Sequence, residues 1–101
     1  MPKGYAIFTV TIRDQAGYDA YLEKALPTIL ESGGRPIVVY DDPEVLEGQS
    51  RGSRIVVLEF DSVEAARNWY SSPAYQAVIG ERHASTTADA VIVGGLEMPG
   101  A

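Results

Sequence analysis

Every second side chain is apolar over the first stretch of the chain that has a readable pattern. One side of this stretch carries Ala6, Phe8, Val10 and Ile12. Successive side chains of a strand point to opposite faces, so this period of two predicts a strand from Tyr5 to Ile12. The opposite face begins with Tyr5 and Ile7 and is therefore also partly apolar.

The next apolar pattern has the spacing of a helix. Apolar residues recur three and four positions apart at Tyr18, Tyr21, Leu22, Ala25, Ile29 and Leu30. Such a stripe is typical of an amphipathic helix that packs one side against a core. Asp14 is predicted to cap the start of this helix. Gly33 and Gly34 are predicted to end it, because glycine readily adopts the left-handed conformation that closes a helix.

Three further apolar runs, rich in β-branched residues, predict strands. They extend over Arg35–Tyr40, Arg54–Phe60 and Ala88–Val93. The polar stretch 41–52, which contains two glycines and a proline, is expected to be a loop. Residues 94–101 are expected to form a frayed tail.

Two helices are predicted between the last two strands. Asp61 followed three residues later by Glu64 resembles a capping box and is expected to start the first of them. The buried stripe of this helix is predicted to consist of Val63, Ala66, Trp69 and Tyr70. Ser72 is expected to cap, and Pro73 to open, a short second helix that ends at Gly80.

The predicted order is strand, helix, strand, strand, helix, short helix, strand. This order is that of the ferredoxin-like split βαβ unit, an α+β fold. We therefore expect a single domain over residues 1–101, with an ordered core at about 4–94 and a four-stranded antiparallel sheet whose helices cover one face.

The other face of this sheet is predicted to be apolar too. In the strand that ends at Phe60, Val56 and Leu58 share one side, while Ile55 and Val57 lie on the opposite side beside Glu59. An uncovered apolar sheet face would be a large adhesive patch. A second copy of the chain is expected to cover it, so that two sheets form the barrel of a homodimer with the helices outside. The alternative is a monomer whose 41–52 loop folds over the sheet.

The composition limits the cellular environments and the partners that can be expected for this protein. The 101 residues include no cysteine, which excludes disulfides and thiolate chemistry. A formal net charge of -6 argues against nucleic acid and anionic membranes as partners. No apolar run is long enough to span a membrane, and the first residues lack the zones of a signal peptide. The sequence therefore favours the cytoplasm.

Several segments resemble one family. They are Gly33-Gly34-Arg35, the Glu44–Gly48 loop, Val56–Phe60 with Asp61 and Ser62, and the segment from Trp69 to Gln76 together with Arg82. With them the chain from Gly4 to Gly94 resembles a bacterial domain-of-unknown-function family, numbered thirteen-thirty, of the dimeric α+β barrel superfamily. The resemblance implies a homodimer. It does not choose among the superfamily's cofactor-free oxygenases, isomerases, haem enzymes and ligand-binding regulators.

Two titratable residues are candidates for catalysis. Glu59 is expected on the open sheet face, where desolvation would suit it to act as a general acid or base. Alternatively it forms a buried ion pair with Arg35, Arg54 or Arg82. His83 is the chain's only histidine and the natural proton shuttle, but it follows Gly80 in an expected polar turn, where a solvated surface position is the competing interpretation.

Aromatic residues offer either a pocket or a core. Trp69, Tyr70 and Tyr75 could stack on a flat organic ligand, since their rings also carry a polar edge. At this spacing such rings more often belong to the core, and that is the interpretation favoured for Trp69. Tyr75 and Tyr40 are expected to expose their hydroxyls.

No motif for a metal, nucleotide or other cofactor is readable, and none is predicted. The acidic loop with Asp41, Asp42, Glu44 and Glu47 lacks the ligand spacing of a calcium-binding EF-hand. The leading hypothesis is a small organic ligand bound between sheet and helices, at Glu59, Trp69, Arg82, His83 and Tyr40. The alternatives are a cofactor-independent oxygenase or isomerase acting on a small aromatic or keto acid, with Glu59 or His83 as base, and a structural oligomer without a ligand.

Overall fold

The structure is a computed structural model that describes residues 2–49 and 52–97. Its elements are β1 (Gly4–Ile12), α1 (Gln15–Glu31), β2 (Arg35–Asp41), β3 (Arg54–Phe60), α2 (Val63–Ser71), α3 (Pro73–Gln76), α4 (Ile79–Ser85) and β4 (Thr86–Gly94). The four strands form one sheet in the order β2-β3-β1-β4, and each neighbouring pair is antiparallel. Residues 98–101 of the predicted tail lie outside the described residues.

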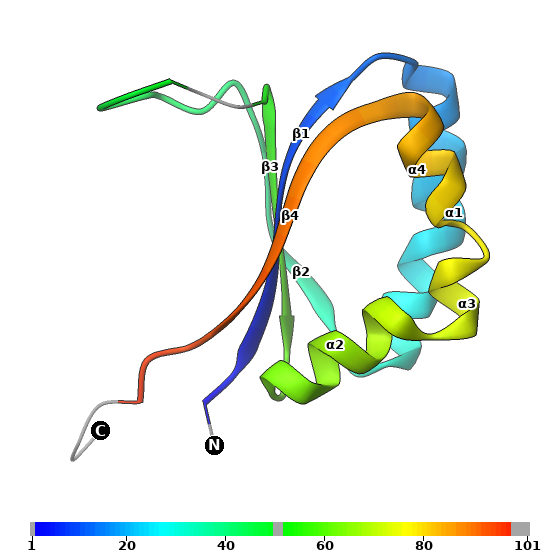
Figure 1. Ribbon diagram of the computed structural model, residues 1–101, viewed down its shortest axis with the longest axis vertical. Helices are drawn as coiled ribbons and strands as arrows, with labels where there is room; N and C mark the ends of the chain where they lie inside the picture. The colour runs from blue at the N-terminus through cyan, green and yellow to red at the C-terminus, as the bar shows by residue number, and fades with distance from the viewer. Residues whose placement is uncertain (1, 50–51, 98–101) are drawn as a thin grey trace.

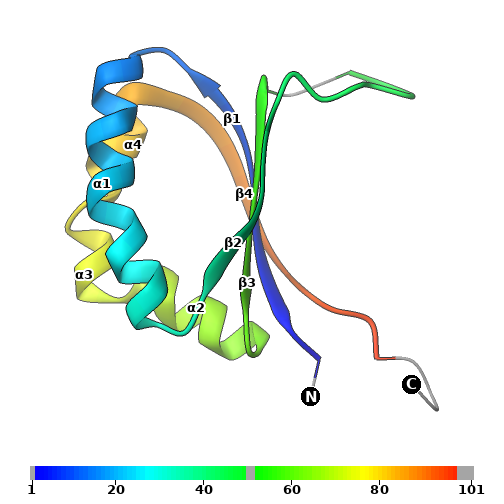
Figure 2. The ribbon, with the colours of Figure 1, turned by 180° about the vertical axis from the view of Figure 1, so that it is seen from behind.

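All the helices lie on one side of the sheet, as Figure 1 shows from one side and Figure 2 from behind. The predicted α+β fold is therefore confirmed. The described part of the β2–β3 connection extends away from the sheet at one end, and the C-terminal segment extends away at the other (Figure 1). The alternative in which this connection folds over the open face does not agree with its described residues.

The core forms between the helices and the inner face of the sheet, which carries the predicted Ala6, Phe8 and Val10. Trp69 is 1% exposed and lies with its ring centroid 5.4 Å from that of Phe60 and 4.2 Å from that of Tyr75. Its indole nitrogen donates to the hydroxyl of Thr28 on α1 at 3.0 Å. The interpretation of Trp69 as a core residue is confirmed.

Polar side chains cap the starts of α1, α2 and α3, and one of these caps differs from the prediction. Asp14 accepts a hydrogen bond from the amide of Gly17, and Ser72 accepts one from the amide of Tyr75, as predicted. At α2 the capping residue is Ser62, whose hydroxyl accepts from the amide of Ala65 at 3.0 Å. The assignment of the cap to Asp61 was wrong, because the extended residue directly before the first helical turn is Ser62.

The segment after Tyr75 differs most from the prediction. Gly80 does not end a helix; it lies in the first turn of α4, which continues to Ser85 and carries His83. The φ angle of Gly80 lies outside the left-handed region. Among the described residues, Gly33, Gly48 and Asp42 have φ angles in that region. The last strand begins at Thr86, because Thr86 and Thr87 pair with Ile12 and Thr11 and so extend the ladder between β1 and β4.

Candidate functional site

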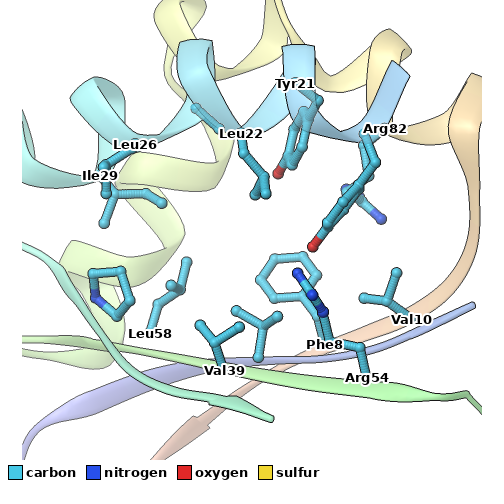
Figure 3. A pocket seen from close by; sticks show the side chains of 14 residues that line it. Phe8, Val10, Tyr21, Leu22, Leu26, Ile29, Val39, Arg54, Leu58 and Arg82 are labelled. Carbon is cyan, nitrogen blue, oxygen red and sulfur yellow. The ribbon is translucent and has the colours of Figure 1, made fainter. Parts of the chain in front are cut away.

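A cavity of about 220 Å³ lies between the sheet and α1 (Figure 3). Most of the lining is apolar. Four of its side chains have polar ends, namely those of Tyr18, Tyr21, Arg54 and Arg82. The lining residues are Phe8, Val10, Tyr18, Tyr21, Leu22, Ala25, Leu26, Ile29, Pro36, Val39, Arg54, Val56, Leu58 and Arg82. Among the described residues of this lining none is a histidine, aspartate or glutamate.

The cavity opens between α1 and the edge strand β2. Leu22 and Leu26, one helical turn apart, are 38% and 44% exposed, and Val39 of β2 is 55% exposed. All three also line the cavity, so they form its rim. The deeper walls come from Phe8 of β1 and Leu58 of β3, which are 4% and 3% exposed. In Figure 3 the α1 side chains lie above the cavity and the sheet side chains below it.

Three polar side chains form a connected group at one wall. The hydroxyl oxygens of Tyr21 and Tyr75 are 2.7 Å apart, and Nε of Arg82 donates to the Tyr75 hydroxyl at 3.2 Å. All three residues are at most 6% exposed. Tyr21 and Arg82 line the cavity, whereas Tyr75 lies behind them. The expectation that Tyr75 exposes its hydroxyl was wrong, because this group has two buried partners.

Burial also sets the protonation state of the tyrosine that faces the cavity. Desolvation raises the pKa of Tyr21, and the neighbouring Tyr75 hydroxyl raises it further. The phenol of Tyr21 therefore stays protonated at neutral pH and serves as a hydrogen-bond donor or acceptor, not as a base.

Arg54 contributes a second guanidinium, from the sheet side of the cavity. Its Nε and a terminal nitrogen donate to the carboxylate of Asp41 at 2.6 and 3.1 Å. This bidentate pair lowers the pKa of Asp41. The guanidinium carbon also lies 5.6 Å from the ring centroid of Tyr18. Burial raises the pKa of Tyr18, while Arg54 acts in the opposite direction.

The structure brings one of the five predicted ligand residues, Arg82, into this lining. Trp69 is packed in the core beneath α1, and His83 lies exposed on α4. Tyr40 of β2 is 62% exposed. It lies opposite Ile55 of β3, on the same face of the sheet as that residue. A ligand or catalytic role for these residues elsewhere on the protein stays a prediction.

Glu59 lies on the open face of the sheet, as predicted, away from the cavity. Arg35, its cross-strand partner on β2, forms an ion pair with it. The hydroxyl of Tyr5 on β1 donates to its other carboxylate oxygen at 3.0 Å. An ion pair with Arg35 was one of the predicted alternatives, but the pair is not buried as that alternative required, because the side chains of Arg35 and Glu59 are 52% and 16% exposed.

Three of the four polar-ended side chains of the cavity, those of Tyr18, Tyr21 and Arg54, were not predicted from the sequence. The two tyrosines were assigned only to the apolar stripe of α1. One signal was available, because a buried tyrosine normally needs a partner for its hydroxyl, which leucine at the same position does not. No pattern in the sequence pointed to the partners themselves. Within residues 2–49 and 52–97, no group of three or more acidic, histidine or cysteine side chains could hold a metal ion.

These features define a ferredoxin-like α+β protein with a small internal cavity. The chain belongs to the family described as Domain of unknown function (DUF1330), whose model matches residues 3–96. The resemblance read from the sequence is thereby confirmed. No curated protein matches the chain in sequence. Among the described helices, none has the length and apolar character needed to cross a membrane.

Solved structures support the same fold. A protein of unknown function from Rhodopseudomonas palustris, RPA0582, superposes with a TM-score of 0.78 at 17% identity, over 96% of this chain and 85% of that one. SnoaB, a cofactor-independent oxygenase from Streptomyces nogalater, has a TM-score of 0.72 at 10% identity over 100% of both chains. A dimeric ferredoxin-like protein of unknown function from Thermobifida fusca has a TM-score of 0.62 at 14% identity, over 92% and 91%.

Proposed function

We propose that this protein binds a small organic molecule in the cavity between the sheet and α1. The observation that carries the proposal is the cavity itself, a space of about 220 Å³ with apolar walls and a buried polar group at one side. Small-molecule sites in proteins commonly combine an apolar lining with a few convergent polar groups. Pockets for drug-sized ligands measure roughly 300–1,000 Å³, so the ligand here is smaller than those.

Binding without catalysis is favoured over an enzymatic reaction. A general base must come within hydrogen-bond reach of the proton that it removes. None of the described residues that line the cavity is a carboxylate or an imidazole, and the Tyr21 phenol is held protonated by burial. The oxygenase SnoaB shares the fold at 10% identity, and its activity does not extend to this chain on that basis.

Two neutral probes, benzamide and benzyl alcohol, test the proposal in the whole protein. We expect both to perturb the backbone NMR signals of residues around the cavity, chiefly those of α1 and β2. Leu26→Trp places a bulky ring at the rim and should abolish these perturbations. Leu30→Trp is the matched control: Leu30 is one turn further along α1, is 55% exposed and does not line the cavity.

The control variant should bind the probes as the unaltered protein does. Binding that survives Leu26→Trp unchanged would place the ligand elsewhere and contradict the proposal. If neither these neutral probes nor negatively charged probes of similar size perturb the cavity residues, the structural-oligomer alternative is favoured instead.

We also propose that the open face of the sheet binds a second copy of the chain. This face carries Ile7 of β1, Ile55 and Val57 of β3, and Val91 and Val93 of β4, of which the last two are 54% and 40% exposed. The helices lie on the other side (Figure 2). The Thermobifida fusca relative is described as dimeric.

Sedimentation equilibrium at micromolar concentration tests the dimer. We expect twice the chain mass of 10.9 kDa. A chain that sediments as a monomer at that concentration would contradict the proposal.

A further inference from the structure

The cavity contains a positive charge for which the described part of the chain supplies no counter-ion. Arg82 is 5% exposed and lines the cavity from α4. Nε of its side chain donates to the Tyr75 hydroxyl, and its guanidinium carbon lies 5.2 Å from the ring centroid of Phe8. Both partners are uncharged. Within residues 2–49 and 52–97, no carboxylate forms an ion pair with Arg82.

The other described lysines and arginines are in a different situation. Lys3, Lys24, Arg35 and Arg54 each pair with a carboxylate. Arg13 and Arg67 are exposed, where water solvates the charge. Of the lysines and arginines that the structure describes, Arg82 alone is buried.

A buried cation without a counter-ion is unfavourable. An arginine side chain keeps its charge in proteins, so it cannot relieve the cost of burial by losing a proton. Buried charges are therefore normally paired, and the desolvation of an unpaired one lowers stability by several kcal/mol. A cation–π contact and one hydrogen bond to a phenol offset only part of this cost.

The hydroxyl groups beside Arg82 are arranged to assist an anion. Tyr75 accepts the hydrogen bond from Arg82 and lies 2.7 Å from the Tyr21 oxygen. When Tyr75 donates its own proton to Tyr21, the proton of Tyr21 is left to donate into the cavity that this residue lines. A bound oxyanion then receives hydrogen bonds from the guanidinium and from a phenol at the same wall.

The second guanidinium of the lining does not add another unpaired charge. Arg54 is held by the carboxylate of Asp41 through two hydrogen bonds. The site therefore offers one uncompensated positive charge, which suits a ligand with a single negative charge. The remaining wall is aliphatic or aromatic, with Phe8, Val10, Leu22 and Leu58 among its residues, and it suits an apolar body.

We infer that the ligand of this cavity is a small organic acid, whose carboxylate pairs with Arg82 and whose apolar body lies between α1 and the sheet. The inference rests on the proposed function, because it assigns a chemical class to the ligand of the same site. It explains why an arginine occupies a position at which an apolar residue would pack without a desolvation cost.

Isosteric pairs of probes test the inference in the unaltered protein. Benzoate is compared with benzamide, and hexanoate with hexanamide, by calorimetric titration. Hydrogen bonds to a charged group correspond to about tenfold to hundredfold in affinity, so at least one acid should bind about tenfold or more tightly than its amide. The ratio for each pair isolates the contribution of the charge from that of the apolar body.

Three variants locate this preference. Arg82→Met replaces the charged side chain by an unbranched apolar one. It should remove the preference for the acid while the amide still binds. Arg82→Lys keeps the charge and should retain part of the preference. Arg67→Met removes the same charge from the exposed surface of α2 and should leave the affinity ratio unchanged.

Stability without ligand gives a second readout. If Arg82 serves mainly to hold the fold together, Arg82→Met lowers the melting temperature of the free protein. If it is retained for an anion, removing an unpaired buried charge leaves that temperature unchanged or raises it.

The outcomes separate the two proposals. Equal binding of acid and amide, or an acid preference that survives Arg82→Met, overturns the inference and leaves the binding function intact. Failure of every acid and amide to bind in the cavity overturns both. If Arg82→Met does not fold, the ratios in the unaltered protein and in Arg82→Lys still decide the question.

Discussion

The hydroxyl groups of Tyr21 on α1 and Tyr75 on α3 lie 2.7 Å apart in the core, although the two residues are 54 positions apart in the chain. Tyr75 is 0% exposed and also accepts a hydrogen bond from Arg82 of α4. One phenol thus connects three helices behind the cavity.

Tyr75→Phe should lower the free energy of unfolding by about 1–3 kcal/mol, because it leaves the Tyr21 hydroxyl and Nε of Arg82 without their buried partner. Urea denaturation of variant and parent measures the difference. Tyr70→Phe is the control, since Tyr70 is only half-buried and its hydroxyl has no hydrogen bond to the described residues. Equal stabilities of the two variants would contradict the role of Tyr75.

Ser62→Ala should destabilise the protein by about 0.5–2 kcal/mol, because α2 loses the side chain that accepts from the amide of Ala65. Asp61→Ala should change stability by less than about 0.5 kcal/mol, because the pair that Asp61 makes with Lys3 is exposed to solvent. Thermal or urea denaturation compares them. If Asp61→Ala lost more stability than Ser62→Ala, Asp61 would be the capping residue, as the sequence pattern predicted.

The carboxyl group of Asp41 should titrate at a lower pH than an ordinary aspartate, because Arg54 stabilises its charged form and lowers its pKa. Its folded-state pKa is depressed, so the ion pair contributes to stability above the unfolded-state pKa, and this contribution is lost as the pH falls through the folded-state value. Arg54→Gln should move the NMR titration midpoint of Asp41 upward.

The side chain of Asp41 is 61% exposed, so the effect of this pair on overall stability should be small and the titration midpoint is the better measurement. Arg67→Gln, which removes a distant exposed charge, should leave the midpoint in place. A midpoint that does not respond to Arg54→Gln would show that the pair does not persist in solution.

Val91→Lys should weaken self-association without unfolding the chain, because Val91 is 54% exposed on the open face of β4. A charge placed in an apolar interface is desolvated on assembly and has no partner there. Leu30→Lys on α1, on the helical side of the molecule and 55% exposed, is the control and should leave the dimer intact. Sedimentation velocity distinguishes the two. Unchanged association of Val91→Lys would argue against this face as the interface.

Most of the fold was readable from local patterns, because the sheet and its covering helices depend on periodicity. The alternation at Phe8 and Val10 predicted β1 and its buried face, and Ser72 with Pro73 predicted the start of α3. The segment around Gly80 was misread because glycine is compatible with a helix end and with a helical turn, and only the packing of α4 against α1 and the extension of β4 by Thr86 select between them.

The candidate site was much less accessible from the sequence. Arg82 was proposed for it, but Tyr21, Tyr18 and Arg54 were not, since they come from different elements and converge only when α1 lies over the sheet. Tyr75 was expected to expose its hydroxyl, whereas its two buried hydrogen bonds come from residues that no local pattern connects to it.

By itself the sequence determined the class of fold, the family, the apolar character of both sheet faces and the absence of thiol chemistry, because these depend on composition and on periodic spacing along the chain. The tertiary structure alone decided where the cavity lies and which charge inside it has no counter-ion among the described residues. Burial and pairing are properties of the space between elements, so an arginine in a polar-looking segment became a buried cation facing an apolar cavity only once α4 was packed against α1 and the sheet.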